Sequence, residues 1–271
     1  MLKKLNPINP FLSIIRNWYL IKQLSKRLFE MKYRGSFLGL LWSIISPILM
    51  LIIYTFVFSE VFKIRWGTEE TNKFAFAIIM YCGMGVFSIF SESLNGSTSI
   101  IGSHVNYVKK IVFPLEIMPV VQVNLAFLFG IISLIIILFG SIIINGTFQW
   151  TSLYLPLILI PLYFSTCGFA YIISSLSVYF KDMAHFTTLI LQVLFFMTPI
   201  FYPISAVPEK FQFLLLLNPL SIIIEEVRNI MIYGNAPDLI LLLKHTVISY
   251  IIFYLGYLWF MKTKKGFADV L

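Results

Sequence analysis

The sequence predicts an all-α integral membrane protein with six transmembrane helices, and three observations lead to that fold class. Of its 271 residues, 59% are hydrophobic and 12% are charged, which is about half the charged fraction of a soluble domain. The apolar residues gather into runs of about 20 or more, the length that crosses a bilayer as a helix. The runs do not alternate polar and apolar residues, as the strands of a membrane barrel do.

The first 34 residues are expected to form a cytoplasmic segment that contains an amphipathic helix. Between residues 11 and 30, apolar side chains such as Trp18 and Ile21 fall on one helical face, and charged ones such as Arg27 fall on the other. A helix of this kind lies in the membrane interface, parallel to the surface. The helix either only anchors the chain to the membrane or also lies beside a cytoplasmic partner and supports it.

The remaining residues, 35–271, are expected to form one transmembrane domain. Its apolar runs define the expected spans, at about 37–62, 74–94, 117–145, 152–180, 184–202 and 239–260. Charges near the middle of a bilayer are costly, and these runs mostly avoid them.

Residues 203–235 do not fit the pattern of spans. They contain three prolines and two apolar runs, 211–217 and 220–224, neither of which is long enough to cross alone. Broken backbone at membrane depth survives only where protein or a water-filled cavity shields it. We therefore expect an external re-entrant pair of short helices between the fifth and sixth spans.

The distribution of basic residues predicts the orientation. Eight Lys and Arg lie within the first 34 residues and three within the last ten. Basic segments stay in the cytoplasm, so both termini are expected there, which requires an even number of spans. The net charge of +8 is then a membrane-topology signal, and no nucleic-acid partner is expected.

The motifs of several enzyme classes are missing from the sequence. It contains no GxxxxGK[ST] loop, no GxGxxG, no GxSxG elbow and no HExxH or CxxC spacing. These patterns belong to nucleotide, hydrolase and metal sites. No enzyme activity, no bound cofactor and no metal site are expected of this chain. An ion-coupled pump is disfavoured as well, because no series of carboxylates or histidines crosses the bilayer, and a membrane glycosyltransferase because no acidic metal-binding cluster occurs.

Aromatic residues suggest a translocation path, although most aromatic side chains of such a protein face lipid or the core. A minority lining a cavity could stack on the apolar faces of sugar rings, and weak contact at many sites permits passage. The candidates are Phe37, Trp42, Tyr54, Phe196 and Tyr202. Separately, Glu225 and Arg228 share a helical face, which is explained either by a structural ion pair or by a gate.

Five stretches of the chain form a recognisable set: YRGSFLGLLWSIISP (33–47), KKIVFPLEIMP (109–119), KDMAHFTTLILQVLFFMTPIFYP (181–203), VPEKF (207–211) and LNPLSIIIEEVR (217–228). They resemble the membrane subunit of ABC-2 type exporters, in the polysaccharide-export branch that includes O-antigen, capsule and teichoic-acid permeases. They follow that family's order and spacing along nearly the whole chain. One departure is Lys181-Asp182, where the family usually has Arg-Asp.

The resemblance implies an assembly and a function. Two copies of the permease work with two copies of a separate ATPase, which binds ATP and Mg, and together they export a lipid-linked polysaccharide, here most simply O-antigen. The alternatives are a teichoic-acid or capsule polymer, or drugs and small lipids. The resemblance also implies six spans, the interfacial helix and the re-entrant pair.

The resemblance further assigns roles to individual residues. The loop at about 98–114 resembles the coupling helix that contacts the ATPase, and Pro114 would end a short helix there. The implied contact residues are His104, Tyr107, Lys109, Lys110, Phe113, Pro114 and Glu116. Prolines near the outer end of the fifth span are expected to act as hinges. The gate and hinge candidates are Pro199, Pro203, Pro219, Glu225 and Arg228.

Overall fold

The computed structural model describes residues 7–32, 34–57, 73–109 and 113–271. Within these ranges every regular element is a helix and no strand occurs, which confirms the all-α class. The α-helices are α1 (Asn9–Arg16), α2 (Trp18–Lys32), α3 (Trp42–Tyr54), α4 (Lys73–Ser97), α5 (Val105–Lys109), α6 (Ile117–Asn145), α7 (Leu155–Tyr179), α8 (Met183–Met197), α9 (Glu209–Leu217), α10 (Pro219–Arg228), α11 (Leu239–Thr263) and α12 (Phe267–Val270).

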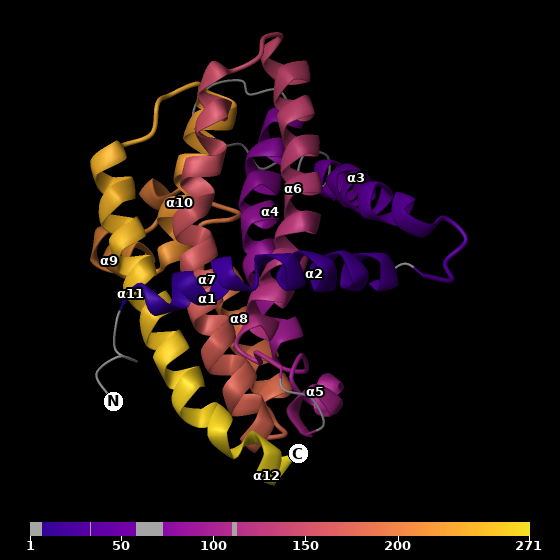
Figure 1. Cartoon of the computed structure of the whole chain (residues 1–271). Coiled ribbons are helices and arrows are strands. Elements are labelled where there is room, and N and C mark those ends of the chain that lie inside the picture. The colour runs from indigo at the N-terminus through magenta and orange to yellow at the C-terminus, as the bar shows by residue number, and fades with distance from the viewer. Residues whose placement is uncertain (1–6, 33, 58–72, 110–112) are drawn as a thin grey trace.

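Four long helices form the body of the molecule. Helices α4, α6, α7 and α11 run roughly along one direction, and the closest pairs are α7 with α11 and α4 with α6 (Figure 1). Helices α1 and α2 lie across this body, and α2 packs on α6 (Figure 1). Helix α3 leans out to the side, whereas α5 and α12 lie together at the end that holds the C-terminus.

Five helical segments in the described ranges are long and apolar enough to cross a membrane: Gly39–Val57, Phe76–Ser97, Ile117–Ile143, Trp150–Tyr179 and Leu239–Val270. They correspond to the expected spans 37–62, 74–94, 117–145, 152–180 and 239–260, although residues 58–62 of the first lie outside the described residues. The remaining expected span, 184–202, contains α8 of only 15 residues. At about 1.5 Å per residue, α8 is roughly 22 Å long, shorter than the hydrocarbon core.

Local sequence explains where the helices near the irregular region begin and end. Two short helices, α9 and α10, occupy 203–235, and the break between them falls at Asn218, whose side chain accepts a hydrogen bond from the backbone N–H of Leu220. Asp238 caps α11 in the same way, accepting from Ile240 and Leu241. Short polar side chains at these positions satisfy donors that have no partner inside the helix.

The N-terminal helix expected over residues 11–30 is divided in two. Asn17 separates α1 from α2, and its Nδ2 donates to the carbonyl oxygen of Ser13 at 2.8 Å. Beyond the break Ile21 is fully buried, whereas Trp18 remains 55% exposed. The segment therefore packs one side on the bundle and leaves large apolar side chains on its surface.

Two glycines determine how closely α7 and α11 approach. A Cβ atom added to Gly256 would lie 2.2 Å from the carbonyl oxygen of Gly168, and one added to Gly168 would lie 2.6 Å from that of Ile252. Helix backbones this close require small residues at the contact, as is common between membrane helices. Among the described residues, α7 and α11 share the most extensive contact between two helices.

Candidate functional site

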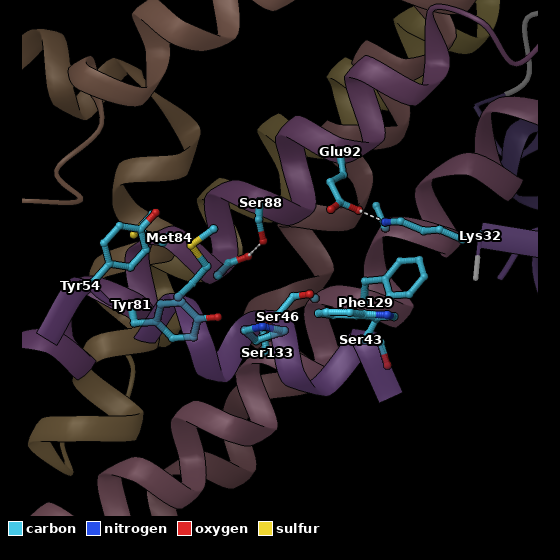
Figure 2. Close-up of a pocket in the computed structure, with 16 residues that line it drawn as sticks. Lys32, Ser43, Ser46, Tyr54, Tyr81, Met84, Ser88, Glu92, Phe129 and Ser133 are labelled. Carbon is cyan, nitrogen blue, oxygen red and sulfur yellow. Dashed lines mark hydrogen bonds and ion pairs between the residues drawn. The ribbon is translucent and has the colours of Figure 1, made fainter. Parts of the chain in front are cut away.

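A groove between α3, α4 and α6 is the main candidate site, with a volume of about 250 Å³. The end of α2 closes one end of it. Figure 2 shows Tyr54 and Tyr81 at one end of the groove, and Lys32 with Glu92 at the other. The lining residues are Lys32, Trp42, Ser43, Ser46, Pro47, Met50, Tyr54, Tyr81, Met84, Gly85, Ser88, Glu92, Ala126, Phe129, Gly130 and Ser133.

Each of the three helices contributes its lining residues at helical spacing. On α4 they include Tyr81, Gly85, Ser88 and Glu92, which follow one another by three or four positions. Residues at these intervals share one face of a helix. On α4, Gly85, Ser88 and Glu92 therefore give the groove a stripe of small and polar side chains on an otherwise apolar helix, while α3 adds aromatic residues.

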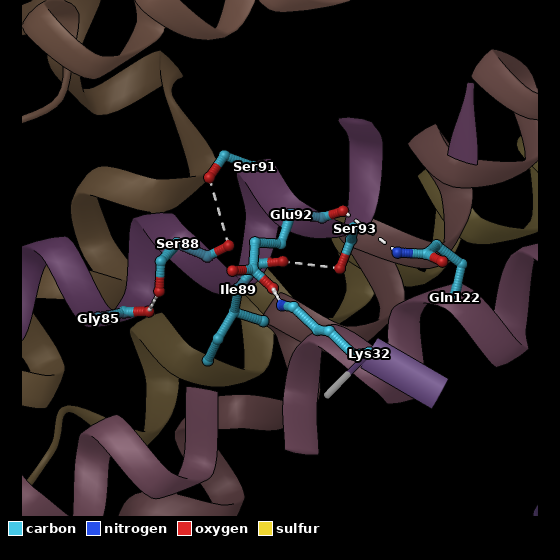
Figure 3. Close-up of polar contacts among 8 residues, drawn as sticks. All are labelled: Lys32, Gly85, Ser88, Ile89, Ser91, Glu92, Ser93 and Gln122. Atoms are coloured by element: carbon cyan, nitrogen blue, oxygen red, sulfur yellow. Dashed lines mark hydrogen bonds and ion pairs between the residues drawn. The ribbon is translucent and has the colours of Figure 1, made fainter. Parts of the chain in front are cut away.

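Two serine hydroxyls of the wall donate to backbone carbonyl oxygens three positions earlier in the chain. Ser88 Oγ donates to the carbonyl oxygen of Gly85 at 2.8 Å, as Figure 3 shows, and Ser43 Oγ donates to that of Leu40 at 2.7 Å. A hydroxyl that has donated its proton still carries lone pairs. The wall therefore presents hydrogen-bond acceptors to whatever enters the groove.

One pair of opposite charges stands at the α2 end. Lys32 Nζ lies 3.3 Å from Glu92 Oε2 and 3.9 Å above the centre of the Phe129 ring (Figures 2 and 3). Both charged side chains are more than a third exposed, so the ion pair itself contributes about 1 kcal/mol or less to stability. Either Lys32 or Glu92 can therefore leave the other and bind a polar ligand at a low cost in free energy.

The structure brings together some of the aromatic residues expected along the path. Trp42 and Tyr54 both line the groove from α3. Phe196 and Tyr202 lie elsewhere, at the end of α8, where the Tyr202 hydroxyl donates to the carbonyl oxygen of Phe196 at 2.9 Å. Phe37 is fully exposed in the turn before α3.

The expected gate residues meet around a buried guanidinium. Arg228 has no exposed surface, and it donates to the carbonyl oxygens of Ile79 (3.1 Å), Pro199 (2.8 Å) and Ile200 (2.8 Å). Its Nη1 also lies 3.0 Å from Glu225 Oε1. Pro203 and Pro219 are not part of this cluster: Pro219 is the first residue of α10, and Pro203 precedes a short 3-10 turn.

Several of the expected coupling residues make contacts at the end of the bundle that holds α5. The rings of His104 and Tyr107 stack at 5.4 Å, and those of Tyr107 and Phe113 at 4.5 Å. Glu116 Oε2 accepts from Lys264 Nζ at 2.7 Å, which joins the start of α6 to the residues after α11. Pro114 lies in the turn before α6, Lys109 is exposed at the end of α5, and Lys110 lies outside the described residues.

Comparison with known proteins identifies the family. Residues 19–232 match the family described as ABC-2 type transporter, which is well over half of the chain. The chain belongs to the ABC-2 type transporter family. This ABC-2 chain is 29% identical over 247 residues to a Klebsiella pneumoniae protein named "O-antigen export system permease protein RfbA", covering 89% of this chain and 91% of that protein. A Myxococcus xanthus protein of the same name is 26% identical over 254 residues, covering 92% and 94%.

Sequence reasoning missed several residues of the ABC-2 chain that the groove brings together. Neither Lys32, one of the eight basic residues counted in the first 34, nor Glu92 was among the candidate site residues, yet they form the ion pair of the groove. The signal that could have found the wall is the regular spacing of Gly85, Ser88 and Glu92 within an apolar helix. Such a stripe on a span indicates a face turned away from lipid.

Proposed function

We propose that this chain is the permease subunit of an ATP-driven exporter that moves a lipid-linked polysaccharide, O-antigen, across the bacterial inner membrane. The observation that carries the proposal is the match, along about nine tenths of both chains, to relatives named as O-antigen export permeases. Membership of the ABC-2 family implies a separate ATP-binding partner. ATP and Mg belong to that partner, and this chain acts as transport machinery rather than as an enzyme.

The groove has the chemistry that a glycan requires. Trp42 and Tyr54 offer ring faces, and the serine hydroxyls offer acceptors for sugar hydroxyl groups. Stacking and single hydrogen bonds are each weak, and weak contacts at several positions allow a polymer to move on. In this proposal Trp42 and Tyr54 contact the polymer within the protomer, while Phe37, Phe196 and Tyr202 extend the path in the assembled exporter.

The topology in this proposal has six spans, with α8 and the residues that follow it forming the short fifth one. Helices α9 and α10 then form the external re-entrant pair, and α1 and α2 lie at the cytoplasmic interface. Residues 1–34 and 35–271 are the corresponding divisions of the chain. Two copies of this chain pair with two copies of the ATPase, and both termini lie in the cytoplasm.

Energy enters through the segment 98–114 in this proposal. Its stacked rings join α5 to Phe113, just ahead of α6, and the adjacent Glu116–Lys264 pair joins the start of α6 to the C-terminal turn. When the ATPase displaces α5, the long helices then move with it, because these contacts connect them. The prolines at 199, 203 and 219 are the hinges at which the backbone near the outer end of the fifth span bends.

Transport by reconstituted vesicles tests the proposal. The chain and its ATPase are placed in vesicles with the ATP site outward, and lipid-linked O-antigen that becomes protected in the lumen is measured. We expect protection that needs both ATP and the ATPase. Vesicles that protect small amphiphiles but not the glycan favour a drug or lipid exporter, and vesicles that protect a teichoic-acid or capsule polymer in its place change the substrate. Protection without an ATPase refutes the mechanism.

A further inference from the structure

A second groove lies on the outer surface between α7 and α11, away from the site described above. It has a volume of about 600 Å³ and is lined by Ile172 and Leu176 of α7 and by Leu255, Leu258, Trp259 and Lys262 of α11. Five of the six lining side chains are apolar or aromatic, and the single cation stands at one end. The proposed transport mechanism does not use this groove.

Two hydrogen bonds join the walls of the groove near the C-terminal ends of α7 and α11. Trp259 Nε1 donates to Ser175 Oγ at 2.8 Å, which fixes the indole against α7. Four residues further along each helix, the Tyr179 hydroxyl donates to the carbonyl oxygen of Thr263 at 2.7 Å and ties the two helix ends together. At the other side, the Gly168–Gly256 contact holds the backbones close. The groove is therefore a fixed feature of this helix pair.

The exposed surface of α11 places the groove at one boundary of the membrane. An apolar stripe recurs every fourth residue, and each member is between 43% and 66% exposed: Leu239, Leu243, Val247, Ile251, Leu255 and Trp259. From Leu239 to Trp259 the helix rises about 30 Å, the thickness of a bilayer's hydrocarbon core. Tryptophan marks the interface, so Trp259 lies at headgroup depth and Lys262 just beyond it.

Lys262 is available to an anion at that depth. It is exposed, and none of the ion pairs found among the described residues includes it, since the acidic groups Glu30, Glu92, Glu116 and Glu225 pair with other cations. A lysine at a helix end extends its charged group toward the headgroups. An apolar channel that ends at such a cation matches an acyl chain that ends in a phosphate.

We propose that this groove binds an anionic phospholipid of the surrounding bilayer, with one acyl chain along Ile172, Leu176 and Leu255 and the phosphate at Lys262. Trp259 lies beside the junction of chain and headgroup. The lipid would fill the space between α7 and α11 on the side of the molecule that faces the membrane. The proposal does not depend on which molecule the chain exports.

Lipid retention by the purified full chain tests the proposal. Native mass spectrometry measures the apparent affinity for phosphatidylglycerol and for phosphatidylcholine with the same acyl chains. We expect phosphatidylglycerol to bind about fivefold more tightly, the effect of one lysine near an anionic headgroup. Lys262→Gln should abolish this preference and leave phosphatidylcholine binding unchanged. The matched control is Lys244→Gln, an exposed lysine near the other end of α11.

A second variant tests the place of the acyl chain. Leu176→Trp fills the groove without changing charge, so it should weaken retention of both lipids severalfold while helical circular dichroism and elution volume stay normal. The proposal is overturned if the wild-type chain retains the two lipids equally, or if Lys262→Gln keeps the preference. It is also overturned if Lys244→Gln removes the preference just as well, or if a folded Leu176→Trp chain binds both lipids normally.

Discussion

Arg228 Nη1 donates to the carbonyl oxygen of Pro199 at 2.8 Å, and this contact ties α10 to the turn that ends α8. The same guanidinium reaches Ile200 in that turn and Ile79 in α4. Pro199 and Ile200 lie in a turn outside the helices, and buried carbonyl oxygens there need donors from elsewhere. One buried side chain therefore holds together three segments that lie far apart in the sequence.

Removing the guanidinium should destabilise the protein strongly. Arg228→Met keeps much of the side-chain volume but leaves the carbonyl oxygens without their charged donor, and losing one partner of a buried ionic network costs about 3–5 kcal/mol. Glu225→Gln should cost only about 1 kcal/mol, because the Glu225 side chain is 30% exposed and the carbonyl contacts remain. Denaturant titration in detergent measures both; equal losses would show that the carboxylate, not the carbonyl set, holds Arg228.

The close contact of α7 and α11 makes a second prediction. Gly256→Leu places a side chain where even a Cβ lies 2.2 Å from Gly168, so the helices must separate at a cost of about 1–3 kcal/mol or more. Gly102→Ala is the matched control, since its Cβ has nothing within 4 Å and its φ is not positive. Melting temperatures in detergent should fall for the first variant only. A normal melting temperature for Gly256→Leu would contradict the observed packing.

The helices with long apolar runs could be predicted from the sequence, because run length and hydrophobicity decide membrane insertion. The short helices of 203–235 followed from three prolines and two brief apolar runs. The partners of Arg228 could not be predicted. A helical period places Glu225 beside it, but the contacts with Ile79 and Pro199 depend on how distant segments pack. The groove was missed in part because its wall combines faces of three helices.

The carboxyl of Glu226 gives stability a pH dependence. Glu226 is 6% exposed and its Oε2 finds no hydrogen-bond partner among the described residues. Burial raises the pKa of this carboxyl, although the backbone N–H of Asp238 and the side chain of Asn229 oppose the rise. The folded state therefore holds the proton more tightly than the unfolded state does.

Comparison with Glu226→Gln isolates that effect. The wild type should gain stability relative to this variant as pH falls through the raised pKa of the folded state, and the variant should be the more stable one above it. Melting temperatures across a pH series give the difference directly. Glu209→Gln, at an exposed position, should show no comparable crossover. A constant difference between wild type and Glu226→Gln at every pH would rule out this source of pH dependence.

The aromatic wall of the groove should affect the rate of export. Trp42→Ala removes a ring face that lines the groove from α3, and we expect export to slow severalfold while ATP hydrolysis by the partner continues. Trp150→Ala is the matched control, because Trp150 is 76% exposed just before the fourth expected span, outside the groove. Initial rates in the vesicle assay separate the two. Unchanged export by Trp42→Ala would show that this side chain packs in the fold and does not contact the polymer.

Charge reversal in the coupling segment tests where ATP energy enters. Lys109 is exposed at the end of α5, beside the stacked rings of Tyr107 and Phe113, and Lys110 follows it. Replacing both lysines by glutamate should leave the bundle folded, because an exposed lysine contributes little to stability. It should weaken contact with the ATPase, since like charges across an interface cost several kcal/mol.

Export by that double variant is expected to fall at least tenfold, whereas ATP hydrolysis by the partner persists at its uncoupled rate. Lys210→Glu reverses an exposed charge on α9, far along the chain from α5, and should leave export unchanged. Measuring phosphate release and protected glycan in the same vesicles distinguishes loss of coupling from loss of assembly. Normal export by the double variant would move the point of energy transfer away from α5, and the Glu116–Lys264 pair would then be the next contact to test.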